Sequence, residues 1–225
     1  MLAALLAASA SIPMTQILPQ KAYATPCADL THCYAEETNN LTTYGNSFTT
    51  IVSDLTLSNY CNYFITVEQW IGLPNGDWLE NGFTTGTFNG SCVTNEMSFH
   101  AKQISGAYSE TNDGAVSVGS TKWYELSDSN KDKVWDVKID GSNVATMTIP
   151  YTSGINQNVG SETTDDSAGV PKTHLYDIAW LKSTLVWEYW GAANTFGAEN
   201  PLWILNCTPN YRHIHVGSGT VGNCT

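Results

Sequence analysis

The sequence predicts an all-β protein, an antiparallel double-sheet β-sandwich of the jelly-roll or concanavalin/lectin-like type. From residue 41 onward, short runs rich in Val, Ile, Thr, Tyr and Phe alternate with turn residues. No segment carries the apolar period of an amphipathic helix. Charged residues make up 13% of the chain, against roughly 25% in ordinary soluble domains. Asn, Ser, Thr and Gly take their place, and these residues form helices poorly.

The first 24 residues have the pattern of an export signal. An apolar run, Leu2–Ala10, is followed by a small-x-small cleavage site at residues 22–24. No Lys or Arg precedes the apolar run, so two outcomes stay open. The segment is either a signal peptide cleaved before Thr25 or an apolar N-terminal arm that stays attached. The run is too short to span a membrane.

Residues 25–225 have no internal repeat and no low-complexity linker, and we expect them to form one domain. Thr25–Asn39 is predicted to be a polar loop. Asp140-Gly141 is a strong hairpin signal. The expected strands are Thr42–Leu57, Asn62–Leu73, Trp78–Phe88, Glu96–Tyr108, Lys122–Leu126, Lys133–Ile139, Ser142–Pro150, Val159–Thr164, His174–Lys182, Thr184–Gly191 and Tyr211–Val216.

Charge and cysteine usage point to an extracellular protein. The formal net charge of -12 argues against a nucleic-acid or anionic-membrane partner. An even number of cysteines without a CxxC pair is typical of disulfides formed in an oxidising compartment. The sequence does not determine the pairing, and we expect three local bridges. These are Cys27–Cys33, Cys61–Cys92 and Cys207–Cys224.

Four Asn-x-Ser/Thr motifs begin at Asn40, Asn89, Asn206 and Asn223. In a host that glycosylates proteins, each would mark a surface loop. Some motifs of this kind arise by chance in a chain rich in Ser and Thr.

The stretch Trp70–Phe83 is predicted to be a β-hairpin, because two apolar runs flank the turn signal Pro74-Asn75-Gly76-Asp77. Strand alternation places Trp78, Glu80 and Gly82 on one face. A carboxylate next to a large aromatic residue and a glycine suits a groove that a ligand or backbone approaches closely. Glu80 is therefore the first candidate functional residue.

Three motifs make the chain similar to the glutamic peptidases: Trp70-Ile71-Gly72-Leu73, Leu79-Glu80-Asn81-Gly82 and Ser98-Phe99-His100-Ala101. The fungal branch of that superfamily has Gln at the position of Glu80, and the neprosin-like branch has Glu. The second family carboxylate lies on a later strand, where this chain has Asn158-Val159-Gly160-Ser161-Glu162. The resemblance extends from about residue 51 to residue 182, and the aromatic residue expected after Glu162 is missing.

The resemblance implies a lectin-like sandwich with Glu80 and Glu162 on its concave face, acting as a secreted endopeptidase at acidic pH. Two close carboxyl groups cannot both ionise cheaply, so one keeps its proton and the other acts as a base. The base activates water, and the acid stabilises the oxyanion that forms. Such a pair requires a polypeptide substrate and no cofactor or metal.

Plainer roles for the same residues stay open. Glu80 could be solvated or paired with Lys102, and Glu162 could lie in an acidic loop that faces water. Trp70 and Trp78 could line the substrate cleft or be buried, and Gln103 could assist as an amide. The alternative carboxylates are Glu68, the best of them because it shares a strand with Trp70, and Glu96, Glu110 and Glu188.

Two further patterns suggest metals only weakly. His213 and His215 share one strand face, a spacing that can bind a metal, but no third ligand is evident in the sequence. Asp128-Ser129-Asn130-Lys131-Asp132 resembles the start of a calcium loop but lacks the following glycine and the distal Glu. We expect no metal at either place.

Two other functions compete with the peptidase. A non-enzymatic filament or surface-layer subunit would use residues 1–24 to complete a neighbour's sheet, and its partner would be another copy of itself. A carbohydrate-binding module would use Trp and Tyr side chains on the concave sheet. The same sandwich supports all three functions.

Overall fold

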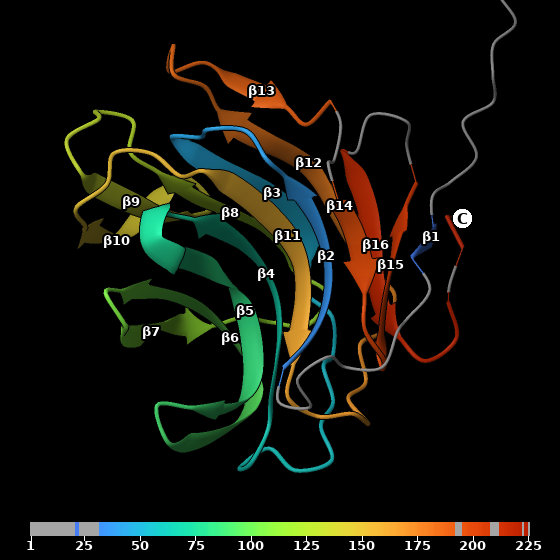
Figure 1. Ribbon diagram of the computed structural model, residues 1–225. Helices are drawn as coiled ribbons and strands as arrows, with labels where there is room; N and C mark the ends of the chain where they lie inside the picture. Colours follow the sequence, from blue (N-terminus) through green and yellow to red (C-terminus); the bar gives the residue numbers. More distant parts are fainter. Residues whose placement is uncertain (1–20, 23–31, 192–194, 208–211, 222, 225) are drawn as a thin grey trace, which may run out of the picture.

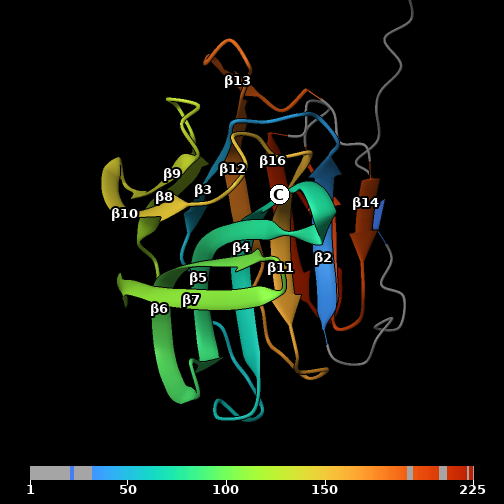
Figure 2. The same cartoon turned by 60° about the vertical axis from the view of Figure 1, so that its left-hand side comes forward.

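The computed structural model describes residues 21–22, 32–191, 195–207, 212–221 and 223–224. The chain folds into two antiparallel β-sheets that lie face to face, as Figures 1 and 2 show. The predicted all-β sandwich is thus confirmed. Within the described residues, the only helical element is a 3-10 turn at Pro74–Gly76.

One sheet has seven strands and carries the candidate site. Its strand order begins at the edge formed by β14 and ends at the edge formed by β7. Every pairing in it is antiparallel. In spatial order the strands are β14 (Thr195–Ala198), β2 (Cys33–Asn39), β11 (Asn156–Thr163), β4 (Phe64–Gly72), β5 (Trp78–Phe88), β6 (Ser91–Ile104) and β7 (Ala107–Ala115).

The second sheet has nine strands. Eight of them form a continuous series, and the ninth, β13 (Trp187–Tyr189), pairs only with β12. The series is β1 (Lys21–Ala22), β15 (Leu202–Asn206), β16 (His213–Ser218), β12 (Thr173–Leu181), β3 (Gly45–Ile51), β8 (Thr121–Ser127), β9 (Val134–Ile139) and β10 (Ser142–Thr148).

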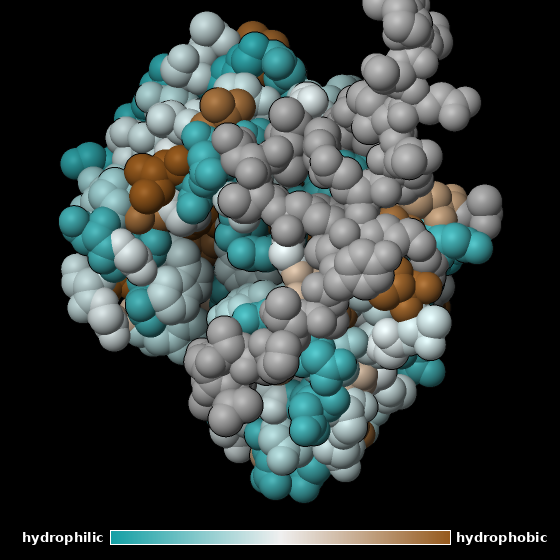
Figure 3. All heavy atoms as spheres, turned by 45° about the vertical axis from the view of Figure 1, so that its right-hand side comes forward, coloured by the Kyte–Doolittle hydropathy of each residue, from teal (hydrophilic) through white to brown (hydrophobic). Residues whose placement is uncertain are grey.

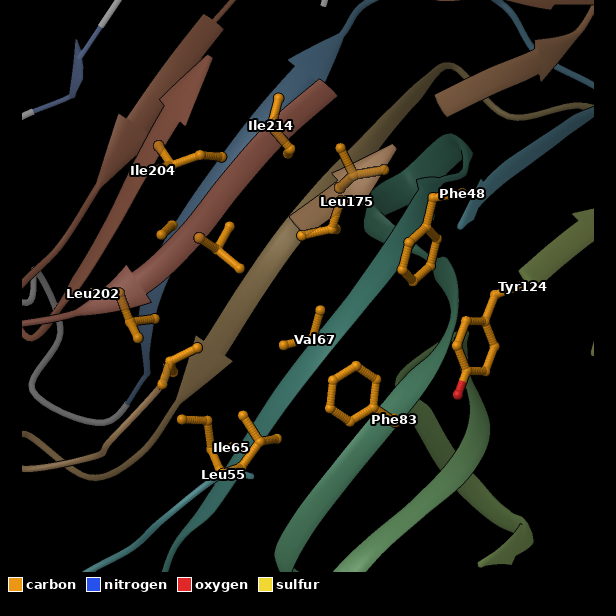
Figure 4. Close-up of a cluster of buried hydrophobic side chains, with 14 of the residues drawn as sticks. Phe48, Leu55, Ile65, Val67, Phe83, Tyr124, Leu175, Leu202, Ile204 and Ile214 are labelled. Atoms are coloured by element: carbon orange, nitrogen blue, oxygen red, sulfur yellow. The ribbon is translucent and has the colours of Figure 1, made fainter. Parts of the chain in front are cut away.

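The main hydrophobic core lies between the two sheets. Figure 4 shows Val67 and Phe83 of the seven-stranded sheet pointing toward Phe48 and Leu175 of the nine-stranded sheet. All four side chains are fully buried. On each of these strands the neighbouring residues point the opposite way, as strand alternation requires. This fixes Glu68, Glu80 and Gly82 on the outer face of the seven-stranded sheet.

The predicted hairpin around residues 70–83 is present as β4 and β5, joined by the 3-10 turn. Two other predictions were wrong. The expected strand Glu96–Tyr108 breaks at a turn where Ser105 and Gly106 both have positive φ, and the chain reverses there from β6 into β7. The expected polar loop contains strand β2. Most of its residues are polar, and even Glu37, which is buried on the same side as Ala35, has a carboxyl group.

Disulfides join Cys61 to Cys92 and Cys207 to Cys224, as predicted. Cys33 is also disulfide-bonded, and its predicted partner, Cys27, lies outside the described residues. The predicted signal or arm lies outside them too, except for Lys21 and Ala22, which pair with β15 of the same chain.

The described surface in Figure 3 is mostly hydrophilic, with hydrophobic residues in separate patches. In the described part of the chain, no helix is long and apolar enough to cross a membrane.

The four glycosylation motifs occupy different environments. Asn40 and Asn223 are exposed. Asn89 is exposed at the β5–β6 turn, where its side-chain amide donates to the Glu110 carbonyl over 3.1 Å. Asn206 is buried in β15, so it does not lie in the surface loop that its motif was expected to mark.

Candidate active site

Three carboxyl groups lie along a diagonal on the outer face of the seven-stranded sheet. Glu68 on β4 is paired with Gly82 of β5 on one side and with Gly160 of β11 on the other. Glu80 lies two residues before Gly82 on β5, and Glu162 lies two residues after Gly160 on β11. Measured along β4, the two residues are therefore displaced from Glu68 in opposite directions. Each is therefore a diagonal neighbour of Glu68, a relation in which long side chains can reach one another.

The two glycines leave room for Glu68 because the strands approach very closely there. A Cβ added to Gly82 would lie 2.2 Å from the Val67 carbonyl oxygen and 2.6 Å from the Glu68 Cα. A Cβ added to Gly160 would lie 2.0 Å from the Ala35 carbonyl oxygen. Any other residue at these positions would have to push backbone apart. The outer face therefore has no side chain on either side of Glu68, and we call this part of the face, from Gly82 to Gly160, the depression.

Glu80 is held as a neutral acid. Its side chain is buried, and it accepts hydrogen bonds from the Trp78 indole N–H at 3.2 Å and from the Tyr108 hydroxyl at 3.4 Å. Burial, followed by the negative charge of Glu162, raises the pKa of Glu80 from 4.5 to about 8. The two hydrogen bonds favour the ionised form but only partly offset the effect of burial.

Glu68 is the most deeply buried of the three carboxyl groups, with 1% of the residue exposed. The Thr66 hydroxyl donates to its Oε1. Its Oε2 has no hydrogen-bond partner among the described residues. Burial raises its pKa well above the usual value, and the charges of Glu80 and Glu162 raise it further. A protonated Oε2 would have a hydrogen bond to donate into the depression.

Glu162 has different partners. The imidazole of His32 contacts its Oε1 through Nδ1, and its backbone N–H donates to the Thr66 hydroxyl over 3.2 Å. Of the three carboxyl groups, Glu162 is the one that contacts a histidine, which distinguishes it from Glu80 and Glu68.

A fourth carboxyl group, that of Glu36 on β2, borders the depression. Burial raises its pKa, while a hydrogen bond from the Asn158 side chain lowers it. Negative charge on Glu162 raises the pKa further. The site therefore concentrates acidic groups in a buried setting, where full ionisation would be costly.

The structure brings most of the sequence-predicted residues to this face. Trp70 is paired with Glu80 across β4 and β5 and is largely buried, with its ring 6.2 Å from that of Tyr34. Trp78 is half-buried beside the Tyr108 ring, 6.4 Å between centroids. Gln103 on β6 pairs directly with Trp78.

Of the other carboxylates considered from sequence, Glu110 shares the Tyr108 hydroxyl with Glu80, whereas Glu96 and Glu188 have separate surroundings. Glu110 accepts hydrogen bonds from the Tyr108 hydroxyl and from the Asn89 backbone N–H. Glu96 accepts a backbone hydrogen bond from Leu55 over 3.0 Å, and Glu188 pairs with Lys182 on the other sheet. Glu80 pairs across the sheet with Ala101, whereas Lys102 pairs with Leu79, whose side chain points to the opposite face.

The histidine pattern has a third member that sequence alone did not show. His174 on β12 pairs across the sheet with His215, and its Nε2 lies 3.3 Å from Nδ1 of His213. Even so, no three His, Cys, Asp or Glu side chains in the described ranges are arranged to hold a metal ion. The Asp128 carboxylate accepts backbone hydrogen bonds from residues 132 and 133 within its own loop.

Sequence reasoning missed four residues of the site: His32, Glu36, Thr66 and Tyr108. His32 lies just before a strand that was predicted to be a loop. Tyr108 belongs to β7, which was merged with its neighbour. Thr66 had a usable signal, because it precedes Glu68 by two residues and strand alternation places both on the same face.

Chemically, the arrangement combines a carboxyl group that contacts a histidine with two carboxyl groups whose pKa values are raised. A base and an acid held on opposite sides of a depression can activate water and protonate a carbonyl oxygen in the same complex. Aromatic side chains at the margin can contact an extended substrate.

Comparisons with known proteins agree with the fold. No family model matches the sequence, and the curated proteins contain no match. Two crystal structures of scytalido-glutamic peptidase, each with a transition state analog, match with TM-scores of 0.56 at 10% and 11% identity. Each alignment covers 84% of this chain and 98% of the other. At this identity the likeness is one of fold: the β-sandwich of this chain is similar to that of scytalido-glutamic peptidase.

Proposed function

We propose that the protein is a secreted glutamic-type endopeptidase that hydrolyses peptide bonds with Glu162 and Glu80. The observation that carries this proposal is the diagonal of buried carboxyl groups, in which Glu80 and Glu68 have raised pKa values and Glu162 contacts a histidine. Strongly perturbed titratable groups gathered in one depression are typical of catalytic sites. The disulfides suit an oxidising extracellular setting.

The surroundings of the carboxyl groups support the following roles. Glu162 is the general base, because of the three carboxyl groups it is the one that contacts a histidine, His32. Glu80 is the general acid, because its pKa of about 8 keeps it protonated at acidic and neutral pH. Glu68 lies between them as a second neutral acid and positions both carboxyl groups.

In the first step, Glu162 takes a proton from a water molecule while the water oxygen attacks the carbonyl carbon of the substrate. The carbonyl oxygen takes up the electron pair of the C=O bond and receives a hydrogen bond from the protonated Glu80. In the second step, the tetrahedral carbon re-forms its C=O bond and the C–N bond breaks. The amine leaves with the proton held by Glu162, which restores both carboxyl groups.

Substrate binding would use the margins of the depression. Trp70 and Trp78 flank Glu80, and Gln103 beside Trp78 offers an amide that can hydrogen-bond to peptide groups. The chemistry needs only side chains of the protein, with a polypeptide as substrate. The raised pKa of Glu80 implies that activity falls as the pH rises through about 8.

The experiment is digestion of an unfolded protein substrate across pH 3 to 9 by three variants. Glu162→Gln removes the base, so we expect kcat/KM to fall by at least about 1000-fold. Glu80→Ala removes the oxyanion donor, with an expected loss of about 100- to 1000-fold. Glu80→Gln keeps a donor that cannot ionise, so it should retain more activity than Glu80→Ala and lose the decline near pH 8.

Glu188→Gln is the matched control, because Glu188 is an exposed carboxylate on the other sheet. Each variant is first compared with the wild type by thermal unfolding, so that loss of fold is separated from loss of chemistry. Full activity in a folded Glu162→Gln or Glu80→Ala protein would overturn the proposal. So would a wild-type protein that leaves the substrate intact at every pH.

A further inference from the structure

A second concave feature lies on the outer face of the nine-stranded sheet, away from the carboxyl diagonal. It is a groove of about 510 Å³, a size that falls in the usual range of ligand sites. Its lining comes from strands β3, β8, β12 and β13. The lining residues are Ser47, Thr49, Trp123, Glu125, Asp177, Ala179, Trp187, Glu188 and Tyr189.

The groove follows from the sizes of the side chains in one cross-strand row. Tyr189, Ala179, Ser47 and Glu125 are paired in that order across four adjacent strands. The two central residues are small, and the two at the ends are large. A row of this composition forms a groove with small side chains along its floor and long side chains along its walls.

Aromatic rings lie on both sides of the groove. Trp187 is 37% exposed and Tyr189 is 47% exposed on β13, and Trp123 on β8 is half-buried on the other side. The guanidinium of Arg212 lies 3.4 Å from the Tyr189 ring centroid, which holds that ring in place. Exposed rings fixed at a groove wall offer flat apolar faces to a ligand.

The acidic side chains of the groove each have a basic partner. Glu125 pairs with Lys138 at 2.8 Å, Asp177 pairs with Arg212 at 3.4 Å, and Glu188 pairs with Lys182. The lining itself holds three carboxylates and no base, and the basic partners stand beside it. Its ion pairs and the hydroxyls of Ser47 and Thr49 can exchange hydrogen bonds with a ligand rich in hydroxyl groups.

We propose that this groove binds a neutral polysaccharide. The ring faces of a sugar carry C–H groups that stack on aromatic side chains, and its hydroxyls match the paired carboxylates and bases. A peptide fits less well, because the floor is the face of paired strands, whose backbone groups already bond to one another. An anionic ligand would meet three carboxylates and no base in the lining.

The site would tether the protein to a glycan-containing surface or matrix. It lies on the sheet opposite to the carboxyl diagonal, so binding is independent of the proposed peptidase chemistry. Either property can therefore fail while the other holds, and the two tests are separate.

The experiment uses the full protein with insoluble cellulose, chitin and β-1,3-glucan, followed by calorimetry with soluble oligosaccharides of whichever polymer retains it. We expect the wild type to bind at least one of them. The double variant Trp187→Ala/Tyr189→Ala should bind at least tenfold more weakly than the wild type. The single variant Trp187→Phe should have an affinity between the two, because it keeps an aromatic ring at position 187. Ile155→Ala, which removes an exposed apolar side chain elsewhere, should bind as the wild type does.

Glu80→Gln is the second control and should bind the polysaccharide normally. Sugar titration of the wild type, followed through its Trp indole signals in NMR spectra, tests the site without any mutation. Absence of binding to all neutral polymers would overturn the proposal. Binding that survives in the double variant, or binding confined to charged polymers, would overturn it too.

Discussion

Glu68 on β4 and Gly82 on β5 are cross-strand partners, and Glu68 fits there because Gly82 has no side chain. A Cβ at Gly82 would lie 2.6 Å from both the Cα and the Cβ of Glu68. The buried acid and the glycine beside it are thus one structural unit. Glu80, two residues before the glycine, borders the same depression.

The first prediction concerns the protonation of Glu68. If it works as a neutral acid, Glu68→Gln keeps a donor in place of its unpartnered Oε2 and retains activity at acidic pH within about threefold. Glu68→Ala leaves the depression without that donor, and kcat/KM falls by about 100-fold. The measurement is a pH profile of kcat/KM for both variants.

The same profile separates a positioning role from a merely structural one. Because Glu80 is unchanged in Glu68→Gln, this variant should keep the decline near pH 8 that Glu80 produces. A Glu68→Gln variant as inactive as Glu162→Gln would mean that Glu68 works in its ionised form, contrary to the raised pKa that burial produces.

The second prediction concerns stability above neutral pH. Glu80 has a folded-state pKa of about 8 against 4.5 unfolded, so between these values the folded state binds more protons. The free energy of unfolding therefore falls as pH rises, by up to about 1.4 kcal/mol per pH unit for each such group. The raised pKa values of Glu37 and Glu68 act in the same direction.

The useful window is pH 6.5 to 8. At lower pH, His174 opposes the trend, because its pKa is lowered to about 4 by burial and by neighbouring His215. Urea unfolding at pH 6.5 and pH 8.0 should show a loss of stability in the wild type. Glu80→Gln should lose roughly 1.5 kcal/mol less over this interval. A wild-type stability that stays level or rises would contradict the prediction.

The third prediction concerns the glycine floor. Gly82→Ala introduces a methyl group 2.2 Å from a backbone oxygen, so β4 and β5 must separate. We expect a destabilisation of about 2 kcal/mol or more and a loss of peptidase activity, although no carboxyl group is changed. Chemical unfolding and kcat/KM are the measurements.

Gly197→Ala is the matched control. Gly197 also lies in a strand of the seven-stranded sheet, and an added Cβ there would meet no atom within 4 Å. Its stability and activity should stay close to those of the wild type. Equal effects at the two positions would show that the close approach at Gly82 does not shape the site.

Residue periodicity alone determined the sandwich class, the hairpin that carries Glu80 and the face on which Glu80 lies. These are local properties, since the alternation of a strand and the chemistry of a turn depend on neighbours in the chain. Gly82 belonged to the same pattern. The local disulfides Cys61–Cys92 and Cys207–Cys224 were also predicted from the sequence.

Only the tertiary structure decided that Glu68 is the centre of the site. Its position between two glycines depends on the registers of β5 and β11 against β4, and these join segments far apart in the chain. The contact of His32 with Glu162 likewise spans 130 residues. Burial set by those long-range pairings, and not residue type, raises the pKa of Glu80.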